Sequence, residues 1–295
     1  MPLSDLERIA LRHIPGSGAV SIERLAAGLV NESYRVRRDG RLYTLRIAAA
    51  NAAELGVDRA WECRVLESAA RAGLAPPVEH CEPSSGIVVS RWVEGRAWTL
   101  EETRQPEQLE TIARLARRIH ALPAPRGACS RSPAEWIAHY EGALGRSGAG
   151  SRYSRGPSRS RELASSLASH LAALDTSPAA AMVLCHSDLH RQNLVVGAGE
   201  LILLDWEYAH LSEPFWDLAG WACNNDLGIE SRRLLLERYL GRPPTAEDSQ
   251  RLDELGWLYD YVCLKWSELY LSLAGGASAG IAARAELLAA RLEGR

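Results

Sequence analysis

The segment Cys185–Glu207 constrains this chain more than any other stretch of its sequence. It reads CHSDLHRQNLVVGAGELILLDWE, and its first half is crowded with polar side chains: His186, Asp188, His190 and Asn193. Two short apolar runs then flank a Gly-Ala-Gly turn, and Asp205 follows the second run. This pattern predicts a loop that leads into a β-hairpin with a carboxylate at its exit. The hairpin would bring Asp205 back beside Asn193 and Asp188. The side chains of all three residues carry oxygen atoms, and Mg²⁺ prefers oxygen ligands.

The same segment resembles a known family. HSDLHRQNL followed by LLDWE is similar to the H-G-D-L-H-x-x-N and I-D-W/F-E signature of the aminoglycoside phosphotransferase superfamily, in its choline, ethanolamine and thiamine kinase branch. The resemblance implies that Asp188 is the catalytic base and that Asn193 and Asp205 are the metal ligands. It also implies a structural role for His186. A helix cap with surface carboxylates is the alternative, but four polar matches at the correct spacing favour catalysis.

Length and composition describe an ordinary globular protein. The chain has 295 residues, of which 46% are hydrophobic and 24% charged, and its formal net charge is -3. These values predict one large or two moderate domains and argue against a nucleic-acid partner. The N-terminus lacks the features of a signal peptide, and no apolar run reaches the length of a membrane span. The six cysteines are widely spaced, which predicts reduced thiols and a cytoplasmic protein without a membrane partner.

The N-terminal part predicts a small antiparallel sheet. Helical spacing covers residues 3–13 and 57–73, and strand patterns cover 20–26, 34–38, 42–47, 78–81 and 87–92. Asp39-Gly40 lies between two of these strands and is a strong hairpin signal. The resemblance implies that residues 1–94 form a nucleotide-binding lobe with one helix packed on the sheet.

Six residues of this lobe are candidate contacts in the ATP site, and four of them precede the last strand. The stretch from Gly28 to Asn31 resembles the G-L-T-N turn that lies over the nucleotide phosphates in choline-kinase-like proteins, and turn N–H groups hold anions. Arg46 stands where protein kinases carry the phosphate-contacting lysine of the third strand, and its fork suits phosphate oxygens. Glu62 matches the helix glutamate that would pair with Arg46. The alternative to these two roles is that Arg46 faces outward from its strand and that Glu62 is a solvated charge on its helix.

The second lobe is expected over residues 95–295. Trp92 and Val93 resemble the hinge before it, whose backbone holds adenine in relatives. Residues 106–120 show a helical apolar face, and residues 130–144 favour another helix. Residues 145–161 are dense in Gly, Ser and Arg, which predicts a mobile surface loop.

The C-terminal part is rich in aromatic residues. Ten of the 18 Trp and Tyr residues follow Asp205. Most are expected to fill the core, but some can form a cage for a cationic head group. The candidate substrate residues are Glu207, Trp221, Trp257, Tyr261 and Trp266. The comparison with bacterial choline kinases implies that Asp217 braces the catalytic loop.

Together these features predict an α+β chain with a bilobal, protein-kinase-like fold. It would have a small antiparallel-sheet N-lobe with one helix and a larger, mainly helical C-lobe. The expected function is ATP- and Mg²⁺-dependent phosphorylation of a primary hydroxyl on a small cationic alcohol, choline or a related amino alcohol. Thiamine is the alternative acceptor, followed by an aminoglycoside, and a non-catalytic kinase-like binding protein is the alternative from another class. The sequence leaves the oligomeric state open.

Overall fold

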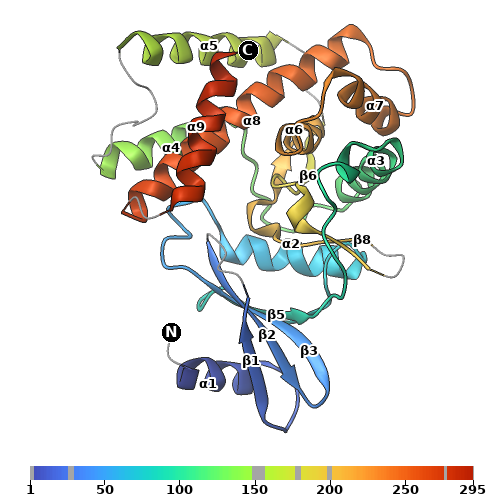
Figure 1. Cartoon of the computed structure of the whole chain (residues 1–295), viewed down its shortest axis with the longest axis vertical. Coiled ribbons are helices and arrows are strands. Elements are labelled where there is room, and N and C mark those ends of the chain that lie inside the picture. The colour runs from blue at the N-terminus through green and yellow to red at the C-terminus, as the bar shows by residue number, and fades with distance from the viewer. Residues whose placement is uncertain are drawn as a thin grey trace. The chain divides into compact units, whose positions relative to one another are not determined.

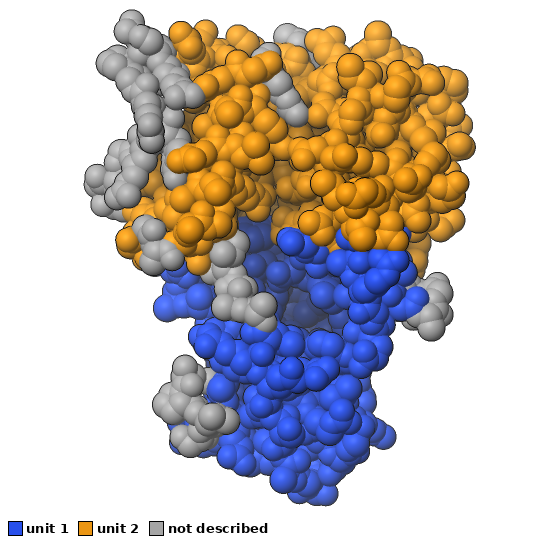
Figure 2. Space-filling model, viewed as in Figure 1, with its two compact units in different colours: residues 1–98, 125–127, 192–209 blue, residues 99–124, 128–191, 210–295 orange. Residues whose placement is uncertain are grey.

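The computed structural model describes residues 3–25, 30–147, 157–176, 181–197, 201–275 and 278–294. These divide into two compact units (Figure 2). Unit 1 comprises residues 1–98, 125–127 and 192–209, and unit 2 comprises residues 99–124, 128–191 and 210–295. The hairpin that follows Asn193 therefore belongs to the same compact unit as the N-terminal sheet. The predicted functional division, with residues 1–94 binding the nucleotide, stays a prediction.

Unit 1 is built on a five-stranded antiparallel sheet with the strand order β1-β2-β3-β5-β4 (Figure 1). Its strands are β1 (Val20–Arg24), β2 (Asn31–Arg38), β3 (Arg41–Ala48), β4 (Val78–Glu82) and β5 (Ile87–Arg91). Asp39 and Gly40 turn the chain between β2 and β3 with φ values of 48° and 75°, as the type I′ turn of a tight hairpin requires. The predicted strands are confirmed, and β2 begins earlier than expected, at Asn31.

Two helices cover opposite faces of this sheet (Figure 1). Helix α1 (Leu3–His13) packs Leu6 and Ala10 against a core cluster that includes Val36 and Val89. Helix α2 (Arg59–Arg71) begins at Asp58, whose side chain accepts a hydrogen bond from the backbone N–H of Trp61 at 3.0 Å. Because side chains alternate along a strand, the two helices contact different residues of the same strands.

The structure corrects the expectation that all six cysteines are thiols. Cys63 of α2 and Cys81 of β4 form a disulfide with a Cα–Cα separation of 5.8 Å, which lies in the usual range for this bond. The two cysteines are 18 positions apart and carry no local motif. They meet because α2 packs on β4. The expected cytoplasmic location stays a prediction.

The hairpin of unit 1 has the predicted form. Strands β7 (Leu194–Val196) and β8 (Leu201–Leu203) pair in antiparallel register, with Leu194 opposite Leu203. A 3₁₀ turn, η2 (Arg191–Asn193), precedes β7, and a second one, η3 (Trp206–Tyr208), follows β8. The hairpin is tied to the chain after β5 by reciprocal backbone hydrogen bonds between Arg96 and Val196, at 3.2 and 2.9 Å.

Unit 2 is mainly helical. Its helices are α3 (Pro106–His120), α4 (Pro133–Ser147), α5 (Pro157–Thr176), α6 (Phe215–Asn224), α7 (Ile229–Leu240), α8 (Ala246–Leu273) and α9 (Ala279–Glu293), and η1 (Glu102–Arg104) is a short 3₁₀ turn. Strands β6 (Val183–Cys185) and β9 (His210–Ser212) pair with each other. Helix α8 packs against α4, α5, α6 and α9, and most of its residues from Leu252 to Leu271 are buried.

The predicted loop over residues 145–161 is wrong at both ends. Helix α4 continues to Ser147, and α5 begins at Pro157, so only residues 148–156 separate them, and these lie outside the described residues. Proline is well suited to the first position of a helix because its missing N–H is not needed there. The low apolar content of this stretch therefore did not exclude a helix.

The expected α+β class is confirmed, with an antiparallel sheet in unit 1 and helices dominating unit 2. Within the described residues, no helix combines the length and the apolar character that crossing a membrane requires.

Candidate active site

A buried network in unit 1 is centred on Arg46 of β3. One terminal nitrogen, Nη1, donates to Asp205 Oδ1 at 2.9 Å, and the other, Nη2, donates to Glu62. The side chain of Glu62 is only 1% exposed and that of Arg46 13%. Burial opposes the charge of Glu62, but Arg46 and Arg59 outweigh it and lower the pKa of Glu62. The pair that the sequence left uncertain is therefore formed, and it includes the candidate metal ligand Asp205.

Arg59, at the first position of α2, extends this network. Its Nη1 donates to Glu62 at 2.7 Å and to Glu207 at 2.8 Å, and its Nη2 donates to Asn31 at 2.9 Å. Asn31 in turn donates to Glu207 at 2.9 Å. Burial, followed by the charge of Asp205, raises the pKa of Glu207 to about 7. Two predicted residues, Asn31 and Glu207, are thus brought together by a residue that sequence reasoning missed.

The signal for Arg59 was present in the sequence. It lies three positions before Glu62 on the same helix, which is the spacing at which opposite charges meet on one face. Its bond to Glu207 carries no such signal, because the two residues are 148 positions apart.

The hairpin register brings the two candidate metal ligands to one end of β7 and β8. The backbone N–H of Leu204 donates to the carbonyl of Asn193 at 2.7 Å, and Asp205 is the next residue. Asp205 has φ 63° and ψ 61°, in the left-handed region that non-glycine residues rarely adopt. Its carboxylate is 39% exposed, whereas Asn193 is buried. Residues in such backbone conformations are often found at functional sites.

In unit 2, the segment that leads to Asp188 is held by Asp217. The carboxylate of Asp217 accepts hydrogen bonds from the backbone N–H groups of His186 at 2.9 Å and Ser187 at 2.7 Å, and it lies 3.1 Å from His120 Nε2. Burial opposes the charge of Asp217, but His120 and His186 outweigh it and lower its pKa. The expected bracing role of Asp217 is confirmed. Ser187, with φ 68°, is a second left-handed residue in the motif.

The carboxylate of Asp188 lies 3.4 Å from His190 Nε2. Burial opposes its charge, but the histidines at 190 and 186 and Arg284 outweigh this effect and lower the pKa of Asp188. The carboxylate is therefore ionised at neutral pH, which is the form that can accept a proton. His190 belongs to the polar cluster that the sequence singled out, whereas Arg284 is a further charged residue near Asp188 that the sequence did not single out.

The candidate substrate aromatics lie within the helices of unit 2. Trp221 in α6 is 0% exposed and Trp257 in α8 is 2% exposed. Trp257 stacks on Tyr261 with ring centroids 5.4 Å apart, and the Tyr261 hydroxyl donates to Glu141 at 3.0 Å. Trp266 is half-buried and stacks on its neighbour one helical turn later. The structure thus gives most of these rings a core environment, and Trp266 is the one with an exposed part.

The other candidate nucleotide contacts have mixed outcomes. Gly28 lies outside the described residues. Trp92 and Val93 directly follow β5, and the backbone N–H of Trp92 donates to the carbonyl of Leu42 at 3.1 Å. Their proposed contacts to adenine stay predictions.

Comparisons with known proteins agree with this geometry. The sequence model of the phosphotransferase enzyme family matches residues 21–255, which is most of the chain. This chain belongs to the phosphotransferase enzyme family. The expected enzyme class, a phosphotransferase with an alcohol group as acceptor, is thereby confirmed at the level of the family.

Individual relatives of this phosphotransferase are more distant. The protein LicA of Haemophilus influenzae is 36% identical over 55 residues, a stretch that covers 19% of this chain and 21% of LicA, so the match spans about a fifth of that protein. A choline/ethanolamine kinase family protein from Mesorhizobium loti has a similar structure, with a TM-score of 0.78 at 22% identity, covering 99% of this chain and 94% of that one. The choline kinase LicA of Streptococcus pneumoniae has a TM-score of 0.78 at 21% identity, covering 99% of both chains. These likenesses confirm the kinase-like fold.

Proposed function

We propose that this phosphotransferase is an ATP- and Mg²⁺-dependent kinase that phosphorylates the primary hydroxyl of choline or a closely related amino alcohol. The observation that carries the proposal is the pairing of Arg46 with both Glu62 and Asp205. Kinases require the corresponding basic residue and helix glutamate to be paired, together with a metal-binding aspartate. Arg46 then offers its permanent charge to the phosphates of ATP.

Asn193 and Asp205 fit the requirements of Mg²⁺. Both are oxygen donors, and the partly exposed carboxylate of Asp205 is accessible to a metal–nucleotide complex. When bound, Mg²⁺ would neutralise negative charge on the phosphate oxygens. The hydrogen bond from Arg46 orients the carboxylate of Asp205, as outer-sphere partners orient metal ligands in other proteins.

Asp188 is proposed as the general base. Its lowered pKa leaves it ionised, and the hydrogen bonds from His186 and Ser187 to Asp217 fix the backbone that carries it. Asp188 takes the proton of the acceptor hydroxyl, the hydroxyl oxygen bonds to the γ-phosphorus, and the bond from that phosphorus to ADP breaks. Most of the rate enhancement would come from positioning and charge, as in other phosphoryl transfers.

The choice of acceptor rests on the relatives and on the chemistry of unit 2. LicA of Streptococcus pneumoniae is a choline kinase, a solved LicA structure contains AMP, and the Mesorhizobium loti protein belongs to the choline/ethanolamine kinases. The buried carboxylates Asp260 and Glu268 of unit 2 already form salt bridges with Arg291 and Lys265, so the preference for a cationic acceptor rests on the aromatic residues. Aromatic faces suit a quaternary ammonium group.

A substrate screen tests the proposal. ADP release is measured with choline, ethanolamine, thiamine and an aminoglycoside, and the product is identified by phosphorus NMR. We expect choline or ethanolamine to give the highest kcat/KM. If thiamine or the aminoglycoside gives the highest turnover, that compound is the acceptor and the proposal of choline is wrong. ATP binding without turnover of any of the four alcohols would favour the non-catalytic alternative.

A further inference from the structure

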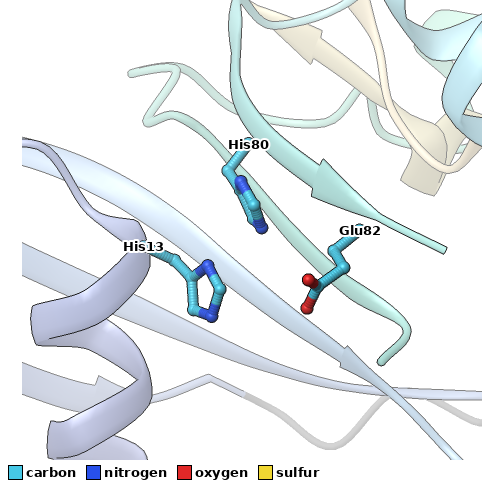
Figure 3. Close-up of side chains that lie close together, drawn as sticks. All are labelled: His13, His80 and Glu82. Carbon is cyan, nitrogen blue, oxygen red and sulfur yellow. The ribbon is translucent and has the colours of Figure 1, made fainter. Parts of the chain in front are cut away.

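Three side chains of unit 1 that the proposed kinase chemistry does not use converge at the edge of the sheet. His13 is the last residue of α1, and His80 and Glu82 belong to β4 (Figure 3). One donor atom from each side chain lies within 4.8 Å of the other two. The two imidazole centroids are 4.3 Å apart, with ring planes inclined at 35°. Figure 3 shows the three side chains directed toward a common space between the helix end and the strand.

The fold explains why these residues meet. His80 and Glu82 are two positions apart on a strand, so their side chains leave on the same face. His80 pairs with Val89, which belongs to the core cluster under α1, whereas Cys81 points to the opposite face and bonds to α2. The shared face is therefore the one that α1 covers. Strand β4 is also the edge strand of the sheet, which leaves this cluster accessible from solvent.

His80 provides an independent sign of a ligand. Its Nε2 atom is buried and, within the described part of the chain, has no hydrogen-bond partner. Buried polar side-chain atoms nearly always have a partner, and a bound ion is one of the ordinary explanations when none is seen.

The carboxylate of Glu82 is held by a neighbour. The Ser85 hydroxyl donates a hydrogen bond to Glu82. Outer hydrogen bonds of this kind orient metal ligands.

We propose that His13, His80 and Glu82 bind a divalent transition-metal ion of the zinc class. Two imidazole nitrogens and one carboxylate oxygen suit Zn²⁺, whereas Mg²⁺ prefers oxygen ligands throughout. Zinc bonds of about 2.0–2.2 Å place tetrahedral ligand atoms roughly 3.4 Å apart, so half-buried side chains need only small rotations to close on the ion. A water molecule completes the coordination. The ion joins the end of α1 to the edge strand and stabilises unit 1, independently of the proposed kinase reaction.

The first test is metal binding to the full-length protein without a histidine tag, after removal of metals with a chelator. Calorimetry with Zn²⁺ is expected to show one ion per chain, and the melting temperature is expected to rise with Zn²⁺. His13→Ala and His80→Ala should each weaken binding by at least about 100-fold, since even outer-sphere changes cost 10–100-fold. Each variant should also lose the zinc-dependent rise in melting temperature. His139→Ala, which removes an imidazole from unit 2, is the matched control and should bind Zn²⁺ as the wild type does.

Spectroscopy of the wild-type protein with Co²⁺ separates this site from a second group of candidate ligands. His120, Cys185 and Asp217 also have donor atoms within 4.8 Å of one another, but His120 is already hydrogen-bonded to Tyr239 and Asp217. Cobalt at the proposed site should show nitrogen and oxygen ligation without a thiolate band, and an equal concentration of Mg²⁺ should not displace it. A thiolate band, unchanged zinc affinity in both histidine variants, or no binding by the wild type would each overturn the proposal.

Discussion

Arg46 Nη1 lies 2.9 Å from Asp205 Oδ1, so a guanidinium from the third strand holds the carboxylate that follows strand β8. Burial disfavours the charge of Arg46, but its carboxylate neighbours, with Glu62 first, outweigh this and raise its pKa. The guanidinium therefore stays charged in a buried position. Arg46, the candidate phosphate contact, is thereby bonded directly to Asp205, the candidate metal ligand.

The first prediction follows from this geometry. Arg46→Ala should lower kcat/KM for MgATP by about 10–100-fold, because charge-assisted hydrogen bonds contribute roughly 1.5–3 kcal/mol. Arg46→Lys should recover only part of the loss, since an ammonium cannot reproduce the two-pronged contact. Steady-state kinetics at varied MgATP measures both. Arg24→Ala is the control, because Arg24 is an exposed arginine of the same sheet. Equal effects at the two positions would mean that Arg46 has no specific contact with ATP.

The second prediction concerns the metal. Asp205→Ala should weaken MgATP binding more than Asn193→Ala does, because a carboxylate binds a hard dication more strongly than an amide does. Calorimetric titrations with ATP, in the presence of Mg²⁺ and with the metal chelated, provide the comparison. The two variants should differ only when Mg²⁺ is present. If Asp205→Ala binds MgATP like the wild type, the metal is held by other residues.

The third prediction concerns the proposed base. Asp188→Asn should lower kcat by about 10²–10⁴-fold, the usual contribution of general-base assistance, while MgATP affinity and melting temperature change little. Asp253→Asn, at a 65% exposed carboxylate of unit 2, should leave kcat unchanged. Rapid-quench or steady-state assays with the best acceptor give kcat directly. Near-normal turnover of Asp188→Asn would remove this residue from the mechanism.

The candidate site could be predicted from the sequence where its chemistry is local. Asp188, Asn193 and Asp205 lie in one short segment, and the predicted hairpin that brings the backbones of Asn193 and Asp205 to one end is present. A pair between Arg46 and Glu62 could be expected from the order of strand and helix in the family that the sequence resembles, and the structure contains this pair. Arg59 shows the limit, since its partner Glu207 is far along the chain and only the packing of α2 against η3 brings them together.

The aromatic residues and the cysteines show a second limit. A helical stripe of indoles and phenols is compatible with either a core or a ligand cage, and burial decides between them only after the helices of unit 2 are packed. The disulfide between Cys63 and Cys81 depends on a helix and a strand meeting face to face. Neither the burial of the aromatic rings nor the disulfide can be predicted from the spacing of residues within one segment of the sequence.

The fourth prediction concerns this disulfide. Closing a loop of 18 positions restricts the unfolded chain, which should contribute about 3 kcal/mol to the free energy of unfolding. The double variant Cys63→Ser, Cys81→Ser should therefore unfold at lower denaturant concentration than the oxidised wild type. Dithiothreitol should destabilise the wild type and leave the double variant unaffected. Cys129→Ser, which removes an unbonded thiol, should retain the response to dithiothreitol. If dithiothreitol does not change the denaturation midpoint of the wild type, the disulfide is absent in solution.

The last prediction concerns the charge of the acceptor. A cation over an aromatic face gains roughly 0.5–2 kcal/mol, which ranks choline above a neutral molecule of the same shape by about one order of magnitude in kcat/KM. The neutral comparison is 3,3-dimethylbutanol. Trp266→Leu, at a half-buried ring, should raise KM for choline and leave KM for MgATP nearly unchanged. Trp257→Leu should instead lower the melting temperature, because this ring is buried between His170 and Tyr261 and its replacement leaves a cavity. Equal efficiency with the two alcohols would exclude recognition of the charge, and the phosphotransferase assignment would stand because it depends on unit 1 and on the family match rather than on the acceptor.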